Sequence, residues 1–289
     1  MPVCEKAYAK INLVLAVTAK RPDGYHEVQT VYQNLALHDT LQLTTLAEDR
    51  IILSCDDPSL PAGPDNLVWL AAERLKRFYR ISRGVHIKLR KRIPVAAGLA
   101  GGSSDAAAVL RGLVRLWHLP WEKEALVQLA AGLGSDVPFC LLGGTALGAG
   151  RGEKITALAP CPHFYVVLAN PGFQVRTAEI YRSLTGTDLE PGCDLTPMLR
   201  ALACGDRDAI MANLSNTLEA AAFRLNPAIR DLKDKLARKA PSLMCGSGPT
   251  VFALFTGREE AERTALSLRR EGIAVWLTET FSQPAAGGE

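Results

Sequence analysis

The segment from Pro94 to Asp105, which reads PVAAGLAGGSSD, constrains this chain more than any other part of its sequence. Glycine has no Cβ and adopts left-handed backbone angles at little cost, so a glycine-rich segment lets the main chain approach a bulky anion closely. Residues 103–117 are rich in alanine and leucine and predict a helix, whose unpaired N-terminal N–H groups favour phosphate. The pattern matches neither a Walker A loop nor G-x-G-x-x-G. It predicts a phosphate-binding loop of another type, and a glycine-rich turn with a serine cap is the alternative.

Hydrophobic periodicity along the rest of the chain predicts an α+β fold. Extended segments are expected at residues 7–17, 25–37, 40–46, 51–55, 84–90, 164–169 and 273–280, with a strand–turn–strand over 242–255. Helices are expected from a cap at Asp65 to residue 78, and over 103–117, 123–131 and 258–270. Strands and helices interleave without the regular alternation of a doubly wound sheet. The run Pro160-Cys161-Pro162 is the predicted boundary between two domains, residues 1–160 and 161–289.

Composition narrows the class of protein. Of the 289 residues, 48% are hydrophobic and the net charge is +3, which excludes a disordered chain and argues against nucleic-acid and membrane partners. The seven cysteines contain no C-x-x-C pair and the N-terminus lacks the apolar run of a secretion signal, so a cytoplasmic protein with reduced thiols is expected. The tail from Pro284 to Glu289 is expected to be frayed.

Two charged residues lie in apolar sequence. Asp136 is the only charged residue between positions 125 and 150. A carboxylate in such a place is costly unless it is hydrogen-bonded or paired, and catalytic acids and bases are often found there. An aspartate ahead of Val-Pro is equally typical of a helix N-cap, so both interpretations stand. Lys10 interrupts an apolar strand. It either lies on a solvated strand face or at a rim, or it is the partner of a catalytic carboxylate, where it would offset charge in phosphoryl transfer.

The remaining motifs are weaker. The segment 245–250, CGSGPT, predicts either an ordinary hairpin turn or a second glycine loop packed against the phosphate site. The five histidines have no metal-ligand spacing, which argues against a zinc site, and no G-x-S-x-G elbow of a serine hydrolase is present. Arg90-Lys91-Arg92 lacks interleaved aromatic residues, so we expect it at a strand end or at the rim of the phosphate site.

Three of these motifs together resemble the signature motifs of the GHMP kinases. They are Lys10 to Leu13, Pro94 to Ser104 and Gly246 to Thr250, and their order covers nearly the whole chain. Further matches at residues 21–26, 65–67 and 134–139 resemble the members of that family that phosphorylate a diphosphocytidyl alcohol. The resemblance implies a two-domain α+β fold, with an N-terminal domain like the second domain of ribosomal protein S5 and a ferredoxin-like C-terminal domain.

The resemblance also implies a reaction. The γ-phosphate of ATP would move to the 2-hydroxyl of a diphosphocytidyl methylerythritol, in the non-mevalonate isoprenoid pathway. Asp136 would be the general base, and Lys10 would keep it ionised. Magnesium would accompany ATP, no tightly bound cofactor is expected, and the sequence assigns no protein ligand to the metal. The expected partners are these small molecules, with the chain a monomer or a weak homodimer.

The matching positions also imply binding residues. The predicted ATP-binding residues are Pro94, Val95, Ala96, Ala97, Gly98, Leu99, Ala100, Gly101, Gly102, Ser103 and Ser104, with Asn66 and Lys91 at the adenosine end. The predicted substrate-binding residues are Asn12, Tyr25, His26 and Tyr181, with the two tyrosines stacking the cytosine and His26 hydrogen-bonding its edge. Ordinary packing is the alternative for the tyrosines. Ala96 and Ala100 stand where many relatives carry glycine, so a methyl group could narrow the approach to phosphate.

Two other functions stay open at this point. A kinase of the same family that acts on homoserine, mevalonate or a sugar would keep the phosphate loop, but it would have no use for a cytosine clamp at Tyr25 and His26. A ligand sensor without phosphoryl transfer would keep the ATP fold but need not keep Lys10 and Asp136.

Overall fold

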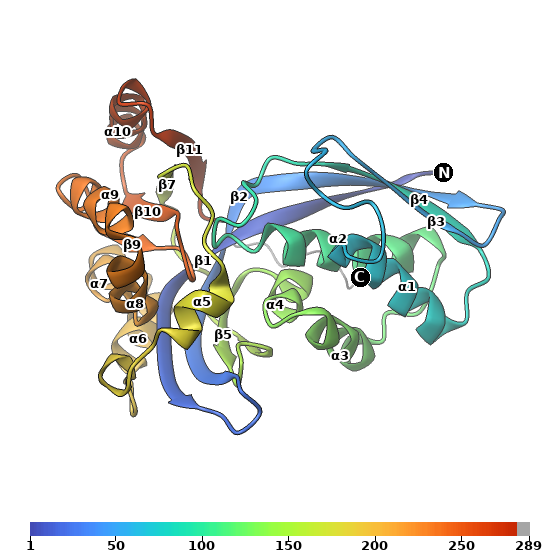
Figure 1. The fold of residues 1–289 in the computed structure, drawn as a ribbon, viewed down its shortest axis with the longest axis horizontal. Helices are drawn as coiled ribbons and strands as arrows, with labels where there is room; N and C mark the ends of the chain where they lie inside the picture. The colour runs from blue at the N-terminus through green and yellow to red at the C-terminus, as the bar shows by residue number, and fades with distance from the viewer. Residues whose placement is uncertain (282–289) are drawn as a thin grey trace.

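Two β-sheets, each covered by helices, organise the chain in the computed structural model (Figure 1). The structure describes residues 1–281, and the tail for which the sequence predicts fraying lies outside the described residues. The strands are β1 Val3–Lys20, β2 His26–Leu46, β3 Ile51–Cys55, β4 Gly84–Arg90, β5 Thr145–Ala149, β6 Lys154–Ala157, β7 Tyr165–Asn170, β8 Ser215–Asn216, β9 Ser242–Met244, β10 Val251–Phe255 and β11 Ala274–Glu279. The helices are α1 Leu67–Tyr79, α2 Gly101–Leu116, α3 Lys123–Leu133, α4 Val137–Leu142, α5 Thr177–Arg182, α6 Thr196–Cys204, α7 Arg207–Ala212, α8 Leu218–Leu225, α9 Pro227–Ala237 and α10 Arg258–Arg270, with a 3₁₀ turn at Gly186–Asp188.

The first sheet is built on the long antiparallel pair β1 and β2. Its order is β3-β4-β2-β1-β8, and β5 joins it beside β2 and continues to β6. Helices α1 to α4 lie along one face (Figure 1). The register of β1 against β2 shifts between Tyr8 and Lys10 and again between Asn12 and Val14. These shifts lie on either side of two predicted site residues, Lys10 and Asn12. A bulge changes the direction of the side chains beside it, so the shifts help to aim these two side chains.

Two details of the predicted elements in this half are wrong. The segments predicted as 25–37 and 40–46 form one continuous strand, β2, because Asp39 is buried and hydrogen-bonded instead of marking a turn. Helix α1 is capped by Asn66, whose side-chain oxygen accepts the Val68 N–H at 2.9 Å, and not by Asp65. The short strands β5 and β6 have no counterpart among the predicted elements, and α4 begins where the helix N-cap interpretation of Asp136 places a helix.

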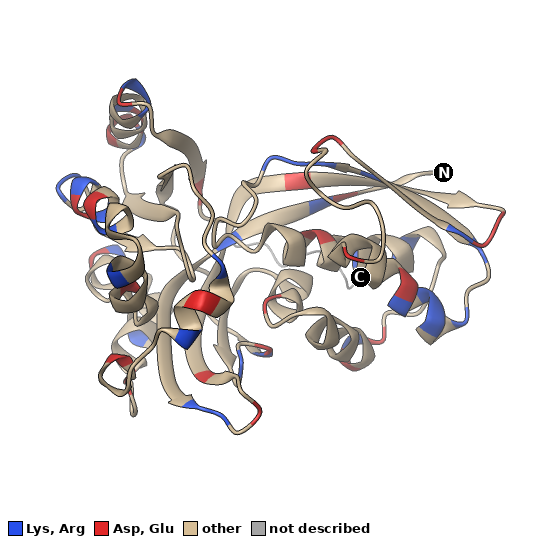
Figure 2. Ribbon diagram, in the orientation of Figure 1, with Lys and Arg blue, Asp and Glu red and all other residues tan. Residues whose placement is uncertain are grey.

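The second sheet has the order β11-β7-β10-β9 and is antiparallel throughout. Charged residues of both signs lie on its outer helices α9 and α10 (Figure 2). The predicted helix 258–270 is confirmed, and the predicted strands 164–169 and 273–280 are confirmed to within a residue at each end. The α+β, two-part fold is therefore as predicted, and the boundary at residues 160–162, between β6 and β7, stays a prediction.

The two halves share a hydrophobic core. Ile11 and Leu13 of β1 belong to the same buried cluster as Phe164, Leu168 and Phe252 of the second half. Strand β8 pairs with β1 in parallel, and the end of the second sheet bridges to β2. The loops between the halves are thus held at a fixed separation by packed elements.

Helix α2 is the buried centre of the first half. Every residue from 104 to 114 is buried, and the alanines at its middle allow close packing against β1 and α1. Arg111 donates to the carbonyls of Cys140 and Lys6 at 2.7 and 2.9 Å, and its guanidinium pairs with Glu5 at 3.4 Å. A buried charge requires such compensation. These contacts fix the helix axis, so the N-terminus of α2 points to the junction of the two halves.

Candidate active site

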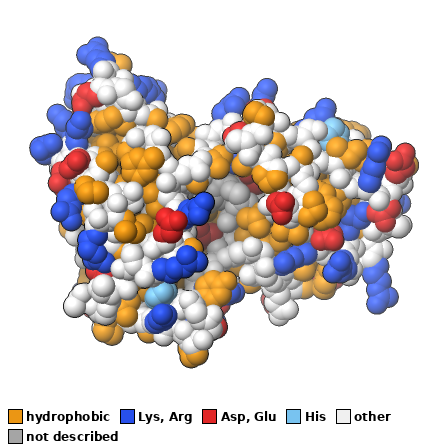
Figure 3. Space-filling view, in the orientation of Figure 1, with side chains coloured by type: hydrophobic (Ala, Val, Ile, Leu, Met, Phe, Trp, Pro, Cys, Tyr) orange, Lys and Arg blue, Asp and Glu red, His pale blue; other side chains and the backbone are white. Residues whose placement is uncertain are grey.

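A cavity of about 950 Å³ lies between the two halves. The surface is hollowed there, and cationic and anionic side chains lie at the rim (Figure 3). That volume is at the upper end of the range for small-molecule sites. The predicted site residues that line it are Lys10, Asn12, Tyr25, His26, Asn66, Lys91, Pro94, Val95, Ala96, Ala97, Gly98, Ala100, Gly101, Gly102, Ser103, Asp136 and Tyr181.

Two predicted ATP-binding residues do not line the cavity. Leu99 is buried in the shared core. The Ser104 hydroxyl donates to the Tyr8 carbonyl at 2.7 Å and so pins the first turn of α2 to β1. The sequence pattern gives no means to separate these inward-facing positions from their neighbours in the same motif.

Two glycine loops meet at the cavity floor. Residues 94–104 form the first glycine loop and residues 245–250 the second. A Cβ at Gly98, whose φ is +76°, would lie 2.0 Å from the Cys245 carbonyl oxygen, so no side chain fits between the loops. The second loop also joins β9 to β10 as an antiparallel hairpin. The hairpin interpretation of residues 245–250 is confirmed, and the segment also packs against the first glycine loop. That the first loop binds phosphate stays a prediction.

Two alanines of the first glycine loop have left-handed backbone angles. Ala96 has φ +52°, and Ala100, the residue before α2, has φ +56°. An L-residue pays roughly 1–2 kcal/mol for this conformation. The two alanines therefore strain the backbone of the loop. The sequence predicted only that their methyl groups would narrow the approach to phosphate, and it did not predict this backbone strain.

Replacing Ala96 with glycine is expected to raise the free energy of unfolding by about 0.5–1 kcal/mol, since relief of the left-handed strain outweighs the greater freedom of glycine in the unfolded chain. The side chain is exposed, so its removal opens no core cavity. Urea unfolding measures the change. Ala62→Gly, at an exposed position without positive φ, is the matched control, and it should lower the free energy of unfolding by about 0.4–1 kcal/mol. Equal losses for the two variants would contradict strain at Ala96.

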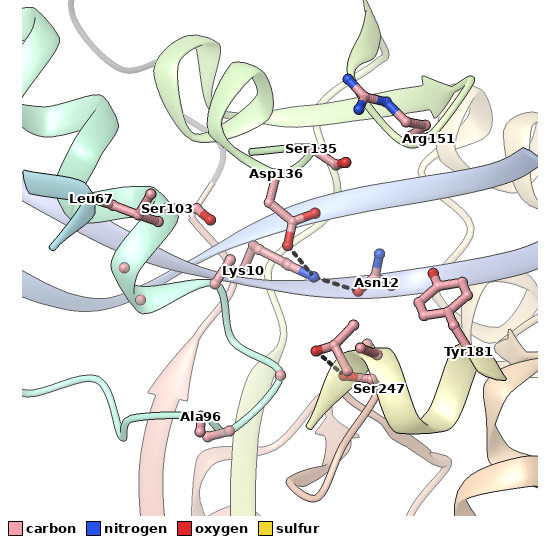
Figure 4. A pocket seen from close by; sticks show the side chains of 18 of the residues that line it. Lys10, Asn12, Leu67, Ala96, Ser103, Ser135, Asp136, Arg151, Tyr181 and Ser247 are labelled. Atoms are coloured by element: carbon pink, nitrogen blue, oxygen red, sulfur yellow. Dashed lines mark hydrogen bonds and ion pairs between the residues drawn. The ribbon is translucent and has the colours of Figure 1, made fainter. Parts of the chain in front are cut away.

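Lys10 and Asp136 form the central ion pair of the cavity. The Lys10 ammonium lies 3.4 Å from Asp136 Oδ2 (Figure 4), and its side chain is 4% exposed against 31% for the carboxylate. Asp136 stands at the N-cap position of α4, but its side chain makes no capping hydrogen bond. The N-cap interpretation of Asp136 is therefore right about its position but wrong about its role, because the side chain does not cap the helix. The carboxylate is paired with a cation and open to the cavity.

The lysine is itself held in place by a chain of hydrogen bonds along β1 and β2. Lys10 Nζ donates to Asn12 Oδ1 at 2.9 Å, and the Asn12 amide donates to Thr30 Oγ1 at 2.7 Å. The Thr30 hydroxyl in turn donates to the Val14 carbonyl at 2.6 Å. A buried amide oriented in this way presents its oxygen to the lysine and fixes the ammonium beside Asp136.

Tyr32 is a further site residue, which the sequence pattern did not single out. Its hydroxyl donates to Asp136 Oδ1 at 3.0 Å, and its ring stacks on Phe139 of α4 with centroids 4.7 Å apart. Burial, followed by the charge of Asp136, raises the pKa of Tyr32 well above its usual value, so the hydroxyl stays protonated and donates. Tyr32 is an aromatic residue within a strand, where aromatic residues are common, so its local sequence does not mark it as a site residue.

Aromatic residues line the opposite end of the cavity from the first glycine loop. The turn before β2 holds Tyr25 through its backbone N–H, which donates to Asp23 at 3.1 Å. The rings of His26 and Tyr181 lie 5.3 Å apart and are tilted by 36°. Burial, followed by the charge of Lys20, lowers the pKa of His26, so its ring is neutral at pH about 7 and can donate or accept.

Cations accompany these rings. The Arg151 guanidinium lies 4.8 Å from the centroid of the Tyr25 ring, in a cation–π contact. Lys20 and Arg182 line the same part of the cavity. Arg151 comes from the turn between β5 and β6, two elements that the sequence analysis missed, so nothing pointed to it.

The two residues predicted at the adenosine end line the cavity with their polar groups already engaged. The Asn66 side chain caps α1 and donates to the Pro61 carbonyl at 2.8 Å. The Lys91 ammonium contacts Asp39 and Asp105. Leu60, Leu67 and Leu89 make this end apolar. A flat base can therefore pack here, with backbone groups as its polar partners.

Residues 1–281 contain no cluster of three or more His, Cys, Asp or Glu side chains that could hold a metal ion. Asp136 is a single carboxylate whose oxygens already contact Lys10 and Tyr32. The described side chains therefore do not form a preassembled magnesium site. Over the same residues, no helix is long and apolar enough to cross a bilayer.

The chain matches two family models, the GHMP kinases N terminal domain over residues 66–144 and the GHMP kinases C terminal domain over residues 198–274. Its fold is also that of a homoserine kinase from Cytophaga hutchinsonii, with a TM-score of 0.77 at 19% identity over 99% of this chain and 96% of that one. The chain belongs to the GHMP kinase family and is a kinase.

Within the family, the chain is similar to one enzyme in particular. It is 45% identical to the 4-diphosphocytidyl-2-C-methyl-D-erythritol kinase of Pelotomaculum thermopropionicum, over 98% of this chain and 99% of that protein. It is also 45% identical to the kinase of the same name from Bacillus subtilis, over 93% of each chain. The crystal structure of a 4-(cytidine 5'-diphospho)-2C-methyl-D-erythritol kinase superposes with a TM-score of 0.82 at 36% identity, covering 97% of this chain and all of that one.

Proposed function

We propose that this kinase transfers the γ-phosphate of ATP to the 2-hydroxyl of 4-diphosphocytidyl-2-C-methyl-D-erythritol, in isoprenoid precursor synthesis. The observation that carries the proposal is the order of groups along one cavity. Figure 4 shows Lys10 and Asp136 between Ser103, at the start of α2, and Tyr181 and Arg151. A catalytic pair placed between a phosphate end and an aromatic, cationic end suits two nucleotide-bearing substrates that meet at their reacting groups.

The ATP phosphates are proposed to lie against the first glycine loop. The N-terminus of α2 presents unpaired N–H groups and the positive end of the helix dipole to the cavity. Gly101, Gly102 and the Ser103 hydroxyl line the cavity there. Magnesium would enter as its complex with ATP, where it supplies charge neutralisation on the phosphates.

Asp136 acts as the general base in this proposal. It takes the proton of the 2-hydroxyl, the freed oxygen forms a bond to the γ-phosphorus, and the bond from that phosphorus to the β–γ bridging oxygen breaks to release ADP. Lys10 offsets the charge that develops on the transferring group. The Tyr32 hydroxyl and the Lys10 ammonium contact different oxygens of the carboxylate, which fixes its plane toward the cavity.

The cytidine end of the substrate is proposed to bind among Tyr25, His26 and Tyr181. A base held outside a duplex is recognised by stacking on aromatic rings and by hydrogen bonds to its edge. Arg151 and Lys20 would then neutralise the substrate diphosphate, because Arg151 contacts the Tyr25 ring, the charge of Lys20 acts on His26, and both cations line the cavity.

The test is ADP release from MgATP with 4-diphosphocytidyl-2-C-methyl-D-erythritol, homoserine and mevalonate offered side by side. Turnover on the first alone is the expected result. Turnover on another alcohol would keep the catalytic pair and discard the cytidine site. Folded protein that binds ATP but turns over none of the three would favour a sensor.

Replacing Tyr32 with phenylalanine is expected to lower kcat by about 10- to 150-fold while the KM for ATP stays within about twofold, since a hydrogen bond to a charged group contributes roughly 1.5–3 kcal/mol. The phenyl ring keeps the stacking on Phe139, so the fold is preserved. Steady-state kinetics measure both constants. Tyr79→Phe removes a hydroxyl that donates to the Pro120 carbonyl outside the cavity lining and should leave kcat unchanged. An unchanged kcat for Tyr32→Phe would contradict its part in holding Asp136.

A further inference from the structure

Two buried carboxylates share one lysine beneath the first glycine loop. Lys91 Nζ donates to Asp105 Oδ2 at 2.7 Å and also to Asp39 Oδ2. The three side chains are 8%, 3% and 0% exposed in the order Lys91, Asp105, Asp39. With all three ionised, this carboxylate pair and its lysine would leave one uncompensated negative charge in the interior, which is expensive.

The carboxylate pair joins both ends of the first glycine loop. Asp39 Oδ1 accepts the backbone N–H groups of Arg92 and Ile93, the residues that lead into the loop. At the other end, a Cβ on Gly101, the first residue of α2, would lie 3.3 Å from Lys91 Nζ. Asp105 follows one helical turn later and, like Lys91, lines the cavity. The pair therefore lies directly behind the N–H groups proposed to bind phosphate.

One oxygen of the pair has no partner. Asp105 Oδ1 is buried and takes part in no hydrogen bond with the residues that the structure describes. Desolvation and the neighbouring Asp39, only partly opposed by Lys91, raise the pKa of Asp105 to about 7. The Cys140 thiol of α4 also interacts with Asp105, and burial raises its pKa to about 12, so it stays neutral. A proton on Asp105 would remove the uncompensated charge.

We propose that the Asp39–Asp105 pair takes up a proton from solvent when the nucleotide phosphates bind, so that nucleotide affinity is linked to pH through Asp105. This rests on the proposed function, because it needs the phosphates at the first glycine loop. Their negative charge raises the cost of a second ionised carboxylate behind the loop. Protonation of Asp105 lowers that cost, and the protonated carboxyl can donate a hydrogen bond to Asp39.

The sign of the effect follows from linkage. At a pH well below its raised pKa, Asp105 already carries its proton and nucleotide binds without uptake. As pH rises through 7, binding must drive protonation, and affinity falls. If the phosphates favour the protonated form by about one pKa unit, the Kd of MgADP rises about tenfold from acidic to basic pH.

Calorimetric titration of the full-length protein with MgADP tests this directly. At pH about 7.5, repeating the titration in buffers of different ionisation enthalpy gives the number of protons taken up. Wild type is expected to take up a substantial fraction of one proton, and Asp105→Asn none, with a Kd that no longer rises with pH. The ligand's own titration is common to both proteins and cancels in the difference.

Two further variants keep the test decisive if Asp105→Asn folds poorly. Asp39→Asn can still accept the N–H groups of Arg92 and Ile93, but removes the charge that opposes ionisation of Asp105, so uptake should also be lost. Glu5→Gln changes a buried carboxylate that packs on α2 and lies outside the cavity lining, so uptake should persist. MgADP binding to wild type without proton uptake, or uptake that survives in both aspartate variants, would overturn the inference alone. Failure of folded wild type to bind MgADP would overturn the proposed function with it.

Discussion

Asp136→Asn is expected to lower kcat by about 10²-fold or more, the usual contribution of a general base. Asparagine matches the shape of aspartate and can still accept the Tyr32 hydroxyl, but it cannot take the proton of the attacking hydroxyl. The affinity for MgADP should change little, because the carboxylate lies beyond the first glycine loop. ADP release measures the first quantity, and calorimetric titration with MgADP measures the second.

A matched control comes from the same cavity. Asp65 also lines it, at the adenosine end, where no atom reacts, so Asp65→Asn should keep the wild-type kcat. Lys10→Met should resemble Asp136→Asn, and the double variant should be little worse than either, since residues that act as a unit are not additive. Near-normal turnover by Asp136→Asn would remove the general base from the mechanism.

Much of the fold could be predicted because the core faces are periodic. The alternation along 7–17 predicts strand β1, although residues 9–17 are buried on both faces, and the spacing in 258–270 predicts α10. The separation predicted between residues 37 and 40 is wrong, because Asp39 lies within one continuous strand and its carboxylate accepts the backbone N–H of Ile93. Tertiary partners, which local pattern does not contain, decided that case.

The candidate site divides in the same way. Lys10, Asp136 and the first glycine loop carry contiguous motifs, so sequence alone proposed them, and the structure brings them to one cavity. Tyr32 and Arg151 contribute single side chains, one from a strand and one from a short turn. Tyr32 and the residue it bonds, Asp136, are 104 positions apart in the sequence. Only the folded chain brings such residues together. Burial, which sequence does not report, distinguishes Ser104 from Ser103 within one motif.

The aromatic end of the cavity is where the proposed substrate is distinguished from other alcohols. Tyr181 lies on α5 of the second half and faces the cavity (Figure 4). Its ring packs beside that of His26. Tyr25 is 54% exposed and its ring faces Arg151. Tyr181 is therefore the more fixed of the two tyrosines, and its ring offers the cytosine a preformed stacking surface at little cost in conformational entropy.

Tyr181→Ala is expected to weaken binding of 4-diphosphocytidyl-2-C-methyl-D-erythritol by about 1–3 kcal/mol, roughly 5- to 150-fold in Kd, the usual effect of removing one aromatic ring from a stacked base. MgADP affinity should be unchanged, because the adenosine end lies across the cavity. Tyr181→Phe keeps the ring and should stay close to wild type, which separates stacking from any role of the hydroxyl. Titration calorimetry with each ligand gives all three numbers. If Tyr181→Ala bound the substrate as tightly as wild type while Tyr25→Ala did not, the stacking surface would be the exposed tyrosine, and the ring from the second half of the chain would have no part in binding the base.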